Sequence, residues 1–346
     1  MVLLYHAFYW TDFIFRPFVA GNEHNWLMLV TQWGFLGVEL FFVLSGFLIT
    51  GILLDTRERP DYFPRFYKRR ALRILPALIA LLIILFTLKV IGLPFFIMSA
   101  LFMANLVPLF GLPLQYIPLW SLAVEEQFYF LWPQAVRRLS LRWLAILAAF
   151  ILVAMPAIRW FTFIHGERNP IYVWFVADGF AMGALLAIFL RTKYATRSMT
   201  RMAGLALVGI GILILLIGLP FGILQTFMLT VRVAGASFLL SSAFFLFGGL
   251  MLLTLLVGTG AWSRVVTPAW LRYVGRISYG LYLVHWLVFI IFDKIVDSIA
   301  PETYNMLIGT DGGLIIRFVI AGGISVVLAA LSREYFEEYF LKRKGV

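Results

Sequence analysis

The chain has 346 residues, of which 62% are hydrophobic and only 13% are charged. Soluble domains average about 45–50% apolar and about 25% charged residues, so this composition excludes an ordinary water-soluble fold. The absence of cysteine excludes disulfide frameworks, thiolate metal sites and cysteine nucleophiles. The net charge of +11 must be read from the places where the basic residues lie, because in a membrane protein such residues set the orientation.

The apolar residues form about ten or eleven stretches, most of them close to the ~20 residues that a membrane-spanning helix needs. The first, 1–10, has only about half that length, which suggests that the chain starts inside its first helix. The stretches are apolar on all sides, whereas the strands of a membrane barrel alternate lipid-facing with lumen-facing residues. The sequence therefore predicts an all-α polytopic membrane protein with a single transmembrane domain over residues 1–346. In chain order, the expected spans are 1–10, 33–54, 74–92, 95–112, 117–135, 141–164, 171–190, 203–222, 233–257, 277–296 and 313–332.

The basic residues predict the orientation of these spans. Of the 28 Lys and Arg residues, 21 gather in the segments 57–73, 137–142, 191–201, 264–276 and 333–344. The positive-inside rule places such segments in the cytoplasm. Because Arg73 and Arg137 are then both inside, the three apolar stretches between them cannot all cross, and one must be interfacial or re-entrant. We expect about ten crossings with both termini in the cytoplasm, and no nucleic-acid partner.

Ionisable side chains inside a span cost a few kcal/mol and usually face the bundle interior, so each one marks a candidate functional position. These residues are His6, Glu39, Lys89, Glu125, Glu126, Arg159, Asp178, His285 and Arg317. Small residues indicate close helix packing at Gly46, beside Ser45, and in the GxxxG pattern of Gly179 and Gly183.

Glu125 and Glu126 point ~100° apart on a helix, so at most one of them faces a given partner. Two carboxylates in an apolar segment suit proton handling, or the holding of a histidine or arginine. The alternative is an interfacial helix whose acids meet water. His6 and His285 could each take a hydroxyl proton near neutral pH, although a histidine on an apolar helix is more often a packed core residue.

Arg70 and Arg73 are three residues apart and share one helical face at the expected cytoplasmic end of a span. Such a pair could bind a phosphate or pyrophosphate; alternatively, the basic residues of this loop only fix orientation. The sequence contains no HExxH, Gly-x-Ser-x-Gly, Walker or Rossmann pattern, and we expect no metal.

Five stretches together resemble the acyltransferase-3 family of integral-membrane acyltransferases. They are Leu4-Tyr-His6, Gly37-Val-Glu-Leu-Phe-Phe-Val-Leu-Ser-Gly-Phe-Leu48, Tyr67-Lys-Arg-Arg-Ala-Leu-Arg-Ile-Leu-Pro76, Trp120-Ser-Leu-Ala-Val-Glu-Glu-Gln-Phe-Tyr129 and Ile277-Ser-Tyr-Gly-Leu-Tyr-Leu-Val-His285. They occur in the order of the family and cover most of the chain up to residue 290. Each stretch alone is weak, but the ordered set is specific.

The resemblance implies a multi-pass protein of the bacterial inner membrane that moves an acyl group, commonly acetyl, from cytoplasmic acyl-CoA to a hydroxyl group. The acceptor would be a carbohydrate or similar molecule, often at the outer face. His6 matches the essential histidine of the family, and the position of His285 matches a late tyrosine-rich histidine motif. Arg70 and Arg73, with Arg69 beside them, match the RxxR motif that is thought to engage CoA phosphates. The remaining expected site residues are Glu125, Glu126, Ser121, Asp178 and Tyr282.

The expected mechanism has His6 as general base, with Glu125 orienting it, and an acyl-His6 intermediate as an alternative. Family members usually carry an Asp-Gly-Leu-Arg-like stretch upstream of the histidine, and this sequence starts after it. The expectation is therefore a chain truncated inside its first helix, and also one without the SGNH domain of some members. Two other functions stay open, namely a transporter or flippase and an inactive truncated member. The acceptor, acyl chain length and oligomeric state cannot be read from the sequence.

Overall fold

The computed structural model describes residues 1–9, 26–165, 171–221, 235–256 and 268–345. Every regular element within these ranges is helical, which confirms the all-α prediction. The longer helices are α4 Leu36–Asp55, α5 Tyr62–Thr87, α7 Leu119–Arg138, α8 Leu141–Ile164, α9 Ala177–Phe189, α10 Arg197–Gly218, α12 Gly235–Leu256, α14 Ala269–Ile299 and α16 Asp311–Leu331.

Shorter helices connect or extend them. The α-helical ones are α1 Val2–Leu4, α3 Trp26–Thr31, α6 Leu93–Ala100, α15 Pro301–Gly309 and α17 Glu338–Leu341. Two π-helical segments are η1 Tyr5–Tyr9 and η6 Ser332–Glu337, and the 3₁₀ turns are Gln32–Phe35, Ala104–Phe110, Val173–Phe175, Leu219–Phe221 and Lys342–Gly345.

Seven helical segments of the described chain are long and apolar enough to cross a membrane, so the protein is a multi-pass membrane protein. They are Gln32–Asp55, Tyr62–Thr87, Leu141–Ile164, Arg197–Phe221, Gly235–Leu256, Ala269–Ile299 and Asp311–Leu341. Helix α7 is as long as a span but carries four charged residues, and α9 has only 13 residues. The count of about ten crossings and the cytoplasmic position of both termini stay predictions.

The structure identifies which apolar stretch between Arg73 and Arg137 is broken. The predicted span 95–112 is an eight-residue helix, α6, followed by the 3₁₀ turn Ala104–Phe110. Eight residues rise only ~12 Å, well short of the ~30 Å hydrocarbon core. The α-helix cannot continue because Phe102 has a left-handed φ of 56°, and Pro108 lies within the next turn.

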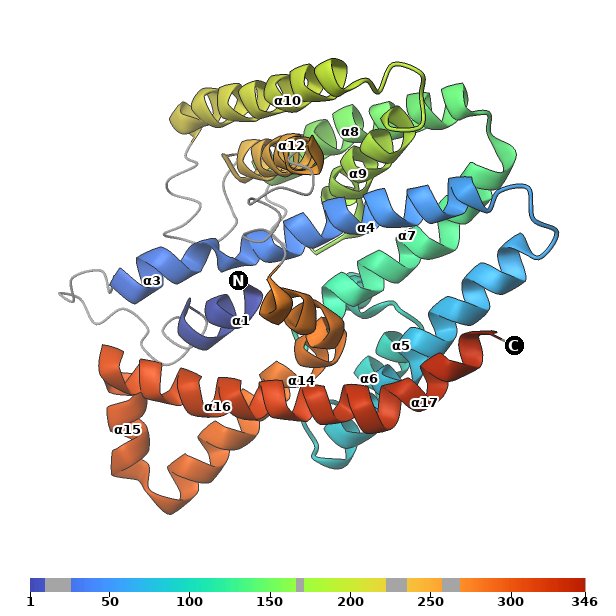
Figure 1. Ribbon diagram of the computed structural model, residues 1–346. Coiled ribbons are helices and arrows are strands. Elements are labelled where there is room, and N and C mark those ends of the chain that lie inside the picture. Colours follow the sequence, from blue (N-terminus) through green and yellow to red (C-terminus); the bar gives the residue numbers. More distant parts are fainter. Residues whose placement is uncertain (10–25, 166–170, 222–234, 257–267, 346) are drawn as a thin grey trace.

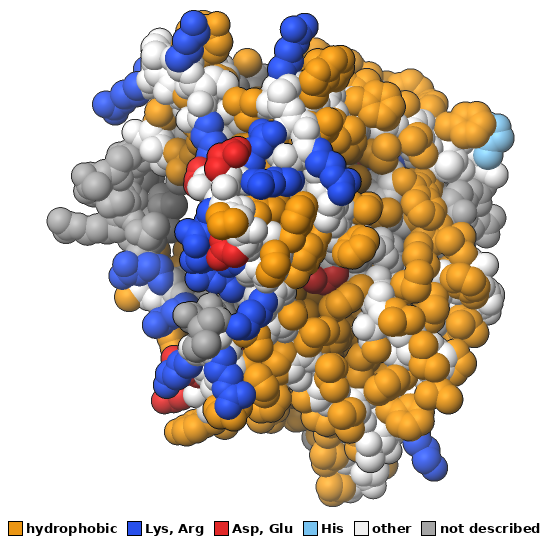
Figure 2. Space-filling model, turned by 90° about the vertical axis from the view of Figure 1, so that its right-hand side faces the viewer, with side chains coloured by type: hydrophobic (Ala, Val, Ile, Leu, Met, Phe, Trp, Pro, Cys, Tyr) orange, Lys and Arg blue, Asp and Glu red, His pale blue; other side chains and the backbone are white. Residues whose placement is uncertain are grey.

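Most long helices lie side by side, and several basic segments meet at one end of the bundle, on the right in Figure 1. The loop after α4, the α7–α8 junction, the loop after α9 and the C-terminus all lie there (Figure 1). Figure 2 shows this end face, on which Lys and Arg side chains gather beside a largely hydrophobic surface. We call it the basic end. This gathering agrees with the loop pattern from which the orientation was predicted.

Helices α4 and α9 touch backbone to backbone, as their small residues predict. A Cβ added at Gly46 would collide with the carbonyl oxygen of Phe180, and one added at Gly183 would collide with that of Val43. Such close contact is the usual role of small residues between membrane helices. It fixes α4 within the core, where Ser45 faces α7.

Candidate active site

Two histidines from opposite ends of the chain form a buried pair. Nδ1 of His6, in the π-helical turn η1, lies 2.8 Å from Nε2 of His285 on α14. The two rings are nearly parallel, with centroids 5.1 Å apart and planes 6° apart, as the hydrogen bond between their edges requires. Their exposed fractions are 6% and 1%. The expected histidines are therefore brought together, and we call them the histidine pair.

The hydrogen bonds of His285 determine the direction of this contact. Its Nδ1 lies 3.0 Å from the carbonyl oxygen of Leu281, which can only accept, so Nδ1 carries the proton. In a neutral ring Nε2 of His285 is then an acceptor, and Nδ1 of His6 must donate to it. This leaves Nε2 of His6 with a lone pair, which is the form that a general base or a nucleophile needs.

The expected arginine is held between two adjacent carboxylates. Arg70 Nη2 donates to Glu125 Oε1 at 2.6 Å, and its Nε donates to Glu126 Oε1 at 3.0 Å. The guanidinium lies 3.7 Å from the centre of the Tyr129 ring. Oε1 of Glu125 also accepts from the Tyr129 hydroxyl and, at 3.3 Å, from Ser45. We call these five residues the arginine cluster.

This geometry corrects two details of the expected mechanism. Glu125 was expected to orient His6, but its partners are Arg70, Tyr129 and Ser45, and the partner of His6 is His285. Arg70 and Arg73 were expected to bind phosphate together. Instead, the side chain of Arg70 is only 15% exposed and is paired with acids, whereas Arg73 is exposed. The reason is that three-residue spacing puts two residues on one face of their own helix but does not determine what packs against that face.

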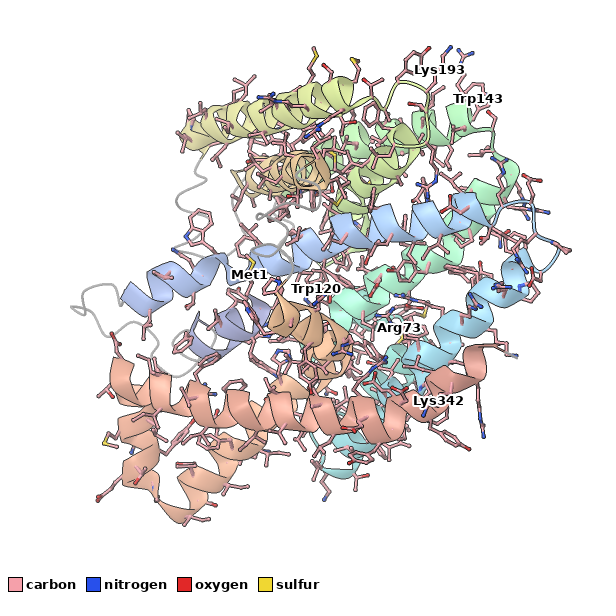
Figure 3. All side chains as sticks on the ribbon, viewed as in Figure 1. Met1, Arg73, Trp120, Trp143, Lys193 and Lys342 are labelled. Carbon is pink, nitrogen blue, oxygen red and sulfur yellow. The ribbon has the colours of Figure 1, made fainter. Side chains whose placement is uncertain are left out.

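Arg73 and Arg69 are the exposed members of the predicted phosphate-binding set. Arg73 lies on α5, which packs against α17 and the turn Lys342–Gly345 that follows it. Figure 3 places the labelled Arg73 and Lys342 in the half of the molecule that leads to the basic end. These residues form a positive surface that an anionic ligand could reach from that end.

A polar contact between α7 and α14 lies between the arginine cluster and the histidine pair. Ser121 Oγ is 2.5 Å from the hydroxyl of Tyr282. Ser121 is one turn before Glu125 on α7, and Tyr282 is one turn before His285 on α14, with the two rings 5.8 Å apart. We call the succession from Arg70 through Glu125, Ser121 and Tyr282 to the histidine pair the polar row.

Asp178 belongs to a different cluster. It forms a bidentate ion pair with Arg159, at 3.1 and 2.9 Å, and both side chains are fully buried. Arg159 also donates to Ser241 on α12 at 2.8 Å. Asp178 therefore joins α8, α9 and α12, and its ion-pair partner, Arg159, lies outside the polar row. Glu39, which is also buried, has a carboxylate oxygen without a hydrogen-bond partner.

The sequence reasoning missed Tyr129 and Ser45 as members of the site. Tyr129 follows Glu125 by four residues, so helical spacing alone could have placed both on one face. Ser45 was assigned to packing because Gly46 follows it; its contact with Glu125 comes from another helix and left no signal in the local sequence.

The fold is a helical membrane bundle, and its core contains a buried histidine pair and an arginine held by glutamates. These features fit the class of membrane-embedded group-transfer proteins. Residues 1–334 match the acyltransferase domain of the acyltransferase-3 family. The chain therefore belongs to the acyltransferase-3 family, as its five motifs indicated.

Two of the curated relatives that the chain matches come from Listeria monocytogenes and Staphylococcus aureus. The peptidoglycan O-acetyltransferase OatA of Listeria monocytogenes is 26% identical over 332 aligned positions, which cover 80% of this chain and 48% of that protein. The O-acetyltransferase OatA of Staphylococcus aureus is 31% identical over 172 positions, covering 42% of this chain and 28% of that protein. This chain thus spans less than half the length of these relatives. No solved structure matches it.

Proposed function

We propose that the protein is a membrane-embedded O-acyltransferase that moves an acyl group, most simply acetyl, from acyl-CoA to a hydroxyl of a cell-envelope carbohydrate. The observation that carries this proposal is the histidine pair. In this pair His285 accepts a hydrogen bond from Nδ1 of His6, which leaves a lone pair on Nε2 of His6. A base fixed in one tautomer by a second hydrogen-bonding group is the arrangement that activates hydroxyl groups in acyl transfer.

In this proposal His6 Nε2 takes the proton of the acceptor hydroxyl as the oxygen attacks the thioester carbonyl. The carbon–sulfur bond breaks, and the proton passes from His6 to the leaving thiolate, so CoA leaves as a thiol. His285 stabilises the imidazolium because its Nε2 accepts from Nδ1 of His6 throughout. The same lone pair could instead take the acyl group as an acyl-His6 intermediate, and the experiment below distinguishes the two routes.

The donor would enter from the basic end. Its phosphates would meet the exposed Arg69 and Arg73, while Arg70, held by Glu125 and Glu126, fixes the start of the polar row. The pantetheine arm would follow the row toward His6. The positive-inside pattern supports a cytoplasmic location for this end, and hence a cytoplasmic acyl-CoA.

The acceptor class follows from the relatives, one of which is named as a peptidoglycan O-acetyltransferase. We infer a polysaccharide or lipid-linked sugar of the envelope as acceptor, and the inner membrane of a bacterium as the location. The second substrate would meet the histidine pair from the end opposite to the basic end.

The test is acyl transfer by the purified protein from radiolabelled acetyl-CoA to soluble peptidoglycan fragments. We expect release of CoA and labelled fragments, and loss of both in His6→Ala, while His165→Ala, which removes an exposed histidine at the end of α8, behaves like the wild type. Label retained on His6 without acceptor would identify the covalent route. Uptake of label into proteoliposomes without CoA release would contradict the proposal and favour a transporter.

A further inference from the structure

A further buried ion pair lies beside the turn that carries His6. Arg317 on α16 donates to both carboxylate oxygens of Asp293 on α14, from Nε at 2.7 Å and from Nη2 at 2.6 Å. The exposed fractions of the two side chains are 3% and 13%. This pair is outside the five motifs and outside the polar row, so the mechanism above does not use it.

The arginine of this pair also holds the turn that carries His6. Nη1 of Arg317 donates to the carbonyl oxygen of Ala7 at 3.0 Å, and Ala7 is fully buried. The planar guanidinium offers five donors in a fixed fork, so two donors can bind a carboxylate while a third binds this carbonyl. The ring of Phe289 lies 4.6 Å below the guanidinium and limits its movement.

The segment held in this way is a π-helical turn, Tyr5–Tyr9. Isolated π-helical turns are rare and occur often at functional sites, because their irregular backbone needs support from the surroundings. Ala7 and Phe8 supply part of that support by packing with Phe289 and Leu314. Arg317 supplies the polar part of the support, because it donates a hydrogen bond to Ala7, the residue next to His6.

We propose that Arg317 is a positioning residue for His6: its bond to Ala7 sets the turn so that the imidazole of His6 reaches His285, and Asp293 fixes the guanidinium in place. A buried ion pair is weak evidence for stability, because desolvation offsets much of its attraction, so a positioning role gives a better account of its presence. This inference rests on the proposed function in that it gives His6 the acyl-transfer step.

The test removes both charges together, since removal of one would leave the other buried and unpaired. In Arg317→Met/Asp293→Leu we expect the thermal unfolding midpoint to stay within a few degrees of the wild type. The turnover number should fall about 10–100-fold with an unchanged KM for acetyl-CoA, because the donor surface is untouched. The matched control is Arg191→Met/Asp55→Leu, which removes a bidentate Arg–Asp pair between α4 and the loop after α9 and should leave turnover unchanged.

A second variant keeps the inference testable if the double variant does not fold. A second readout keeps it testable if the protein shows no acyl transfer. Arg317→Lys keeps the charge but not the fork, so it cannot hold Asp293 at two points and Ala7 as well; we expect it to fold and to show the same selective loss of turnover. The rate at which diethyl pyrocarbonate modifies His6, followed by mass spectrometry, should change in both variants. Wild-type turnover and an unchanged modification rate in Arg317→Lys would overturn the inference. A wild-type protein without acyl transfer would overturn the proposed function instead, while the modification rate would still decide the role of Arg317.

Discussion

His285 holds His6 through a hydrogen bond of 2.8 Å although the two residues are 279 positions apart in the chain. The pair depends on both ends of the protein folding against each other, since η1 precedes the rest of the bundle and α14 comes late in it (Figure 1). The two rings also have distinct roles. Nδ1 of His285 donates to the carbonyl oxygen of Leu281, whereas Nε2 of His6 keeps a free lone pair.

The first prediction concerns this difference. In His285→Ala, Nδ1 of His6 loses its acceptor, so the ring can rotate and change tautomer, and we expect turnover to fall about 10²–10⁴-fold. In His285→Gln the side-chain oxygen can accept from Nδ1, and we expect part of the activity to return. Both variants are compared with the wild type in the radiolabelled transfer assay. Equal loss in the two variants would show that the hydrogen bond to His6 is not the reason for the loss.

Much of the fold follows from the sequence alone. Seven of the predicted spans coincide with helices of the described chain that are long and apolar enough to cross a membrane. Apolar stretches predict helices well because in a bilayer every backbone polar group must be paired within a helix. One of the three apolar stretches between Arg73 and Arg137 was expected not to cross, but the sequence did not single out 95–112, where the left-handed Phe102 interrupts a stretch whose composition is as apolar as that of a span. Composition predicts residence in the membrane, but the path of the backbone depends on local conformation.

The sequence predicted several residues of the site but not the contacts among them. Tyr282 and His285 were named with the family resemblance, and in the structure each contacts another expected site residue. The expected mechanism placed Glu125 beside His6 by analogy with hydrolase triads, whereas Glu125 contacts Arg70, because contacts between helices depend on packing that the motifs do not describe. Asp178 was included because ions in spans are often functional, yet its partner is the equally buried Arg159.

A second prediction separates the two glutamates. Glu125→Gln keeps the shape of the side chain but removes the charge that accepts from Arg70, Tyr129 and Ser45, so we expect it to lower the free energy of unfolding by about 1–3 kcal/mol. Glu126→Gln removes one contact with Arg70 and should cost less. Thermal unfolding in detergent measures both. A larger loss in Glu126→Gln would contradict the central place of Glu125 in the cluster.

A third prediction concerns the donor surface. Arg73→Ala should raise the KM for acetyl-CoA about tenfold with little change in turnover, because Arg73 is exposed and would contact phosphate rather than the reacting atoms. The difference between variant and wild type should shrink as salt is added, since exposed charges are screened. The control is Arg138→Ala, an exposed arginine in the last turn of α7. An equal rise in KM in the control would indicate a general effect of net charge.

The last prediction uses the contact between α4 and α9, which positions Ser45 for Glu125. A methyl group at Gly183 would collide with the backbone of α4 at Val43, and the backbone cannot move aside as a side chain could. We therefore expect Gly183→Ala to lower the free energy of unfolding by about 1–3 kcal/mol or more. Gly209 on α10 has no atom within 4 Å of an added Cβ, so Gly209→Ala should be neutral or gain up to about 1 kcal/mol from helix propensity.

Because α4 also presents Ser45 to the arginine cluster, Gly183→Ala should reduce acyl transfer as well as stability, whereas Gly209→Ala should leave transfer unchanged. Equal thermal midpoints for the two variants would mean that α4 and α9 are not in backbone contact in the membrane.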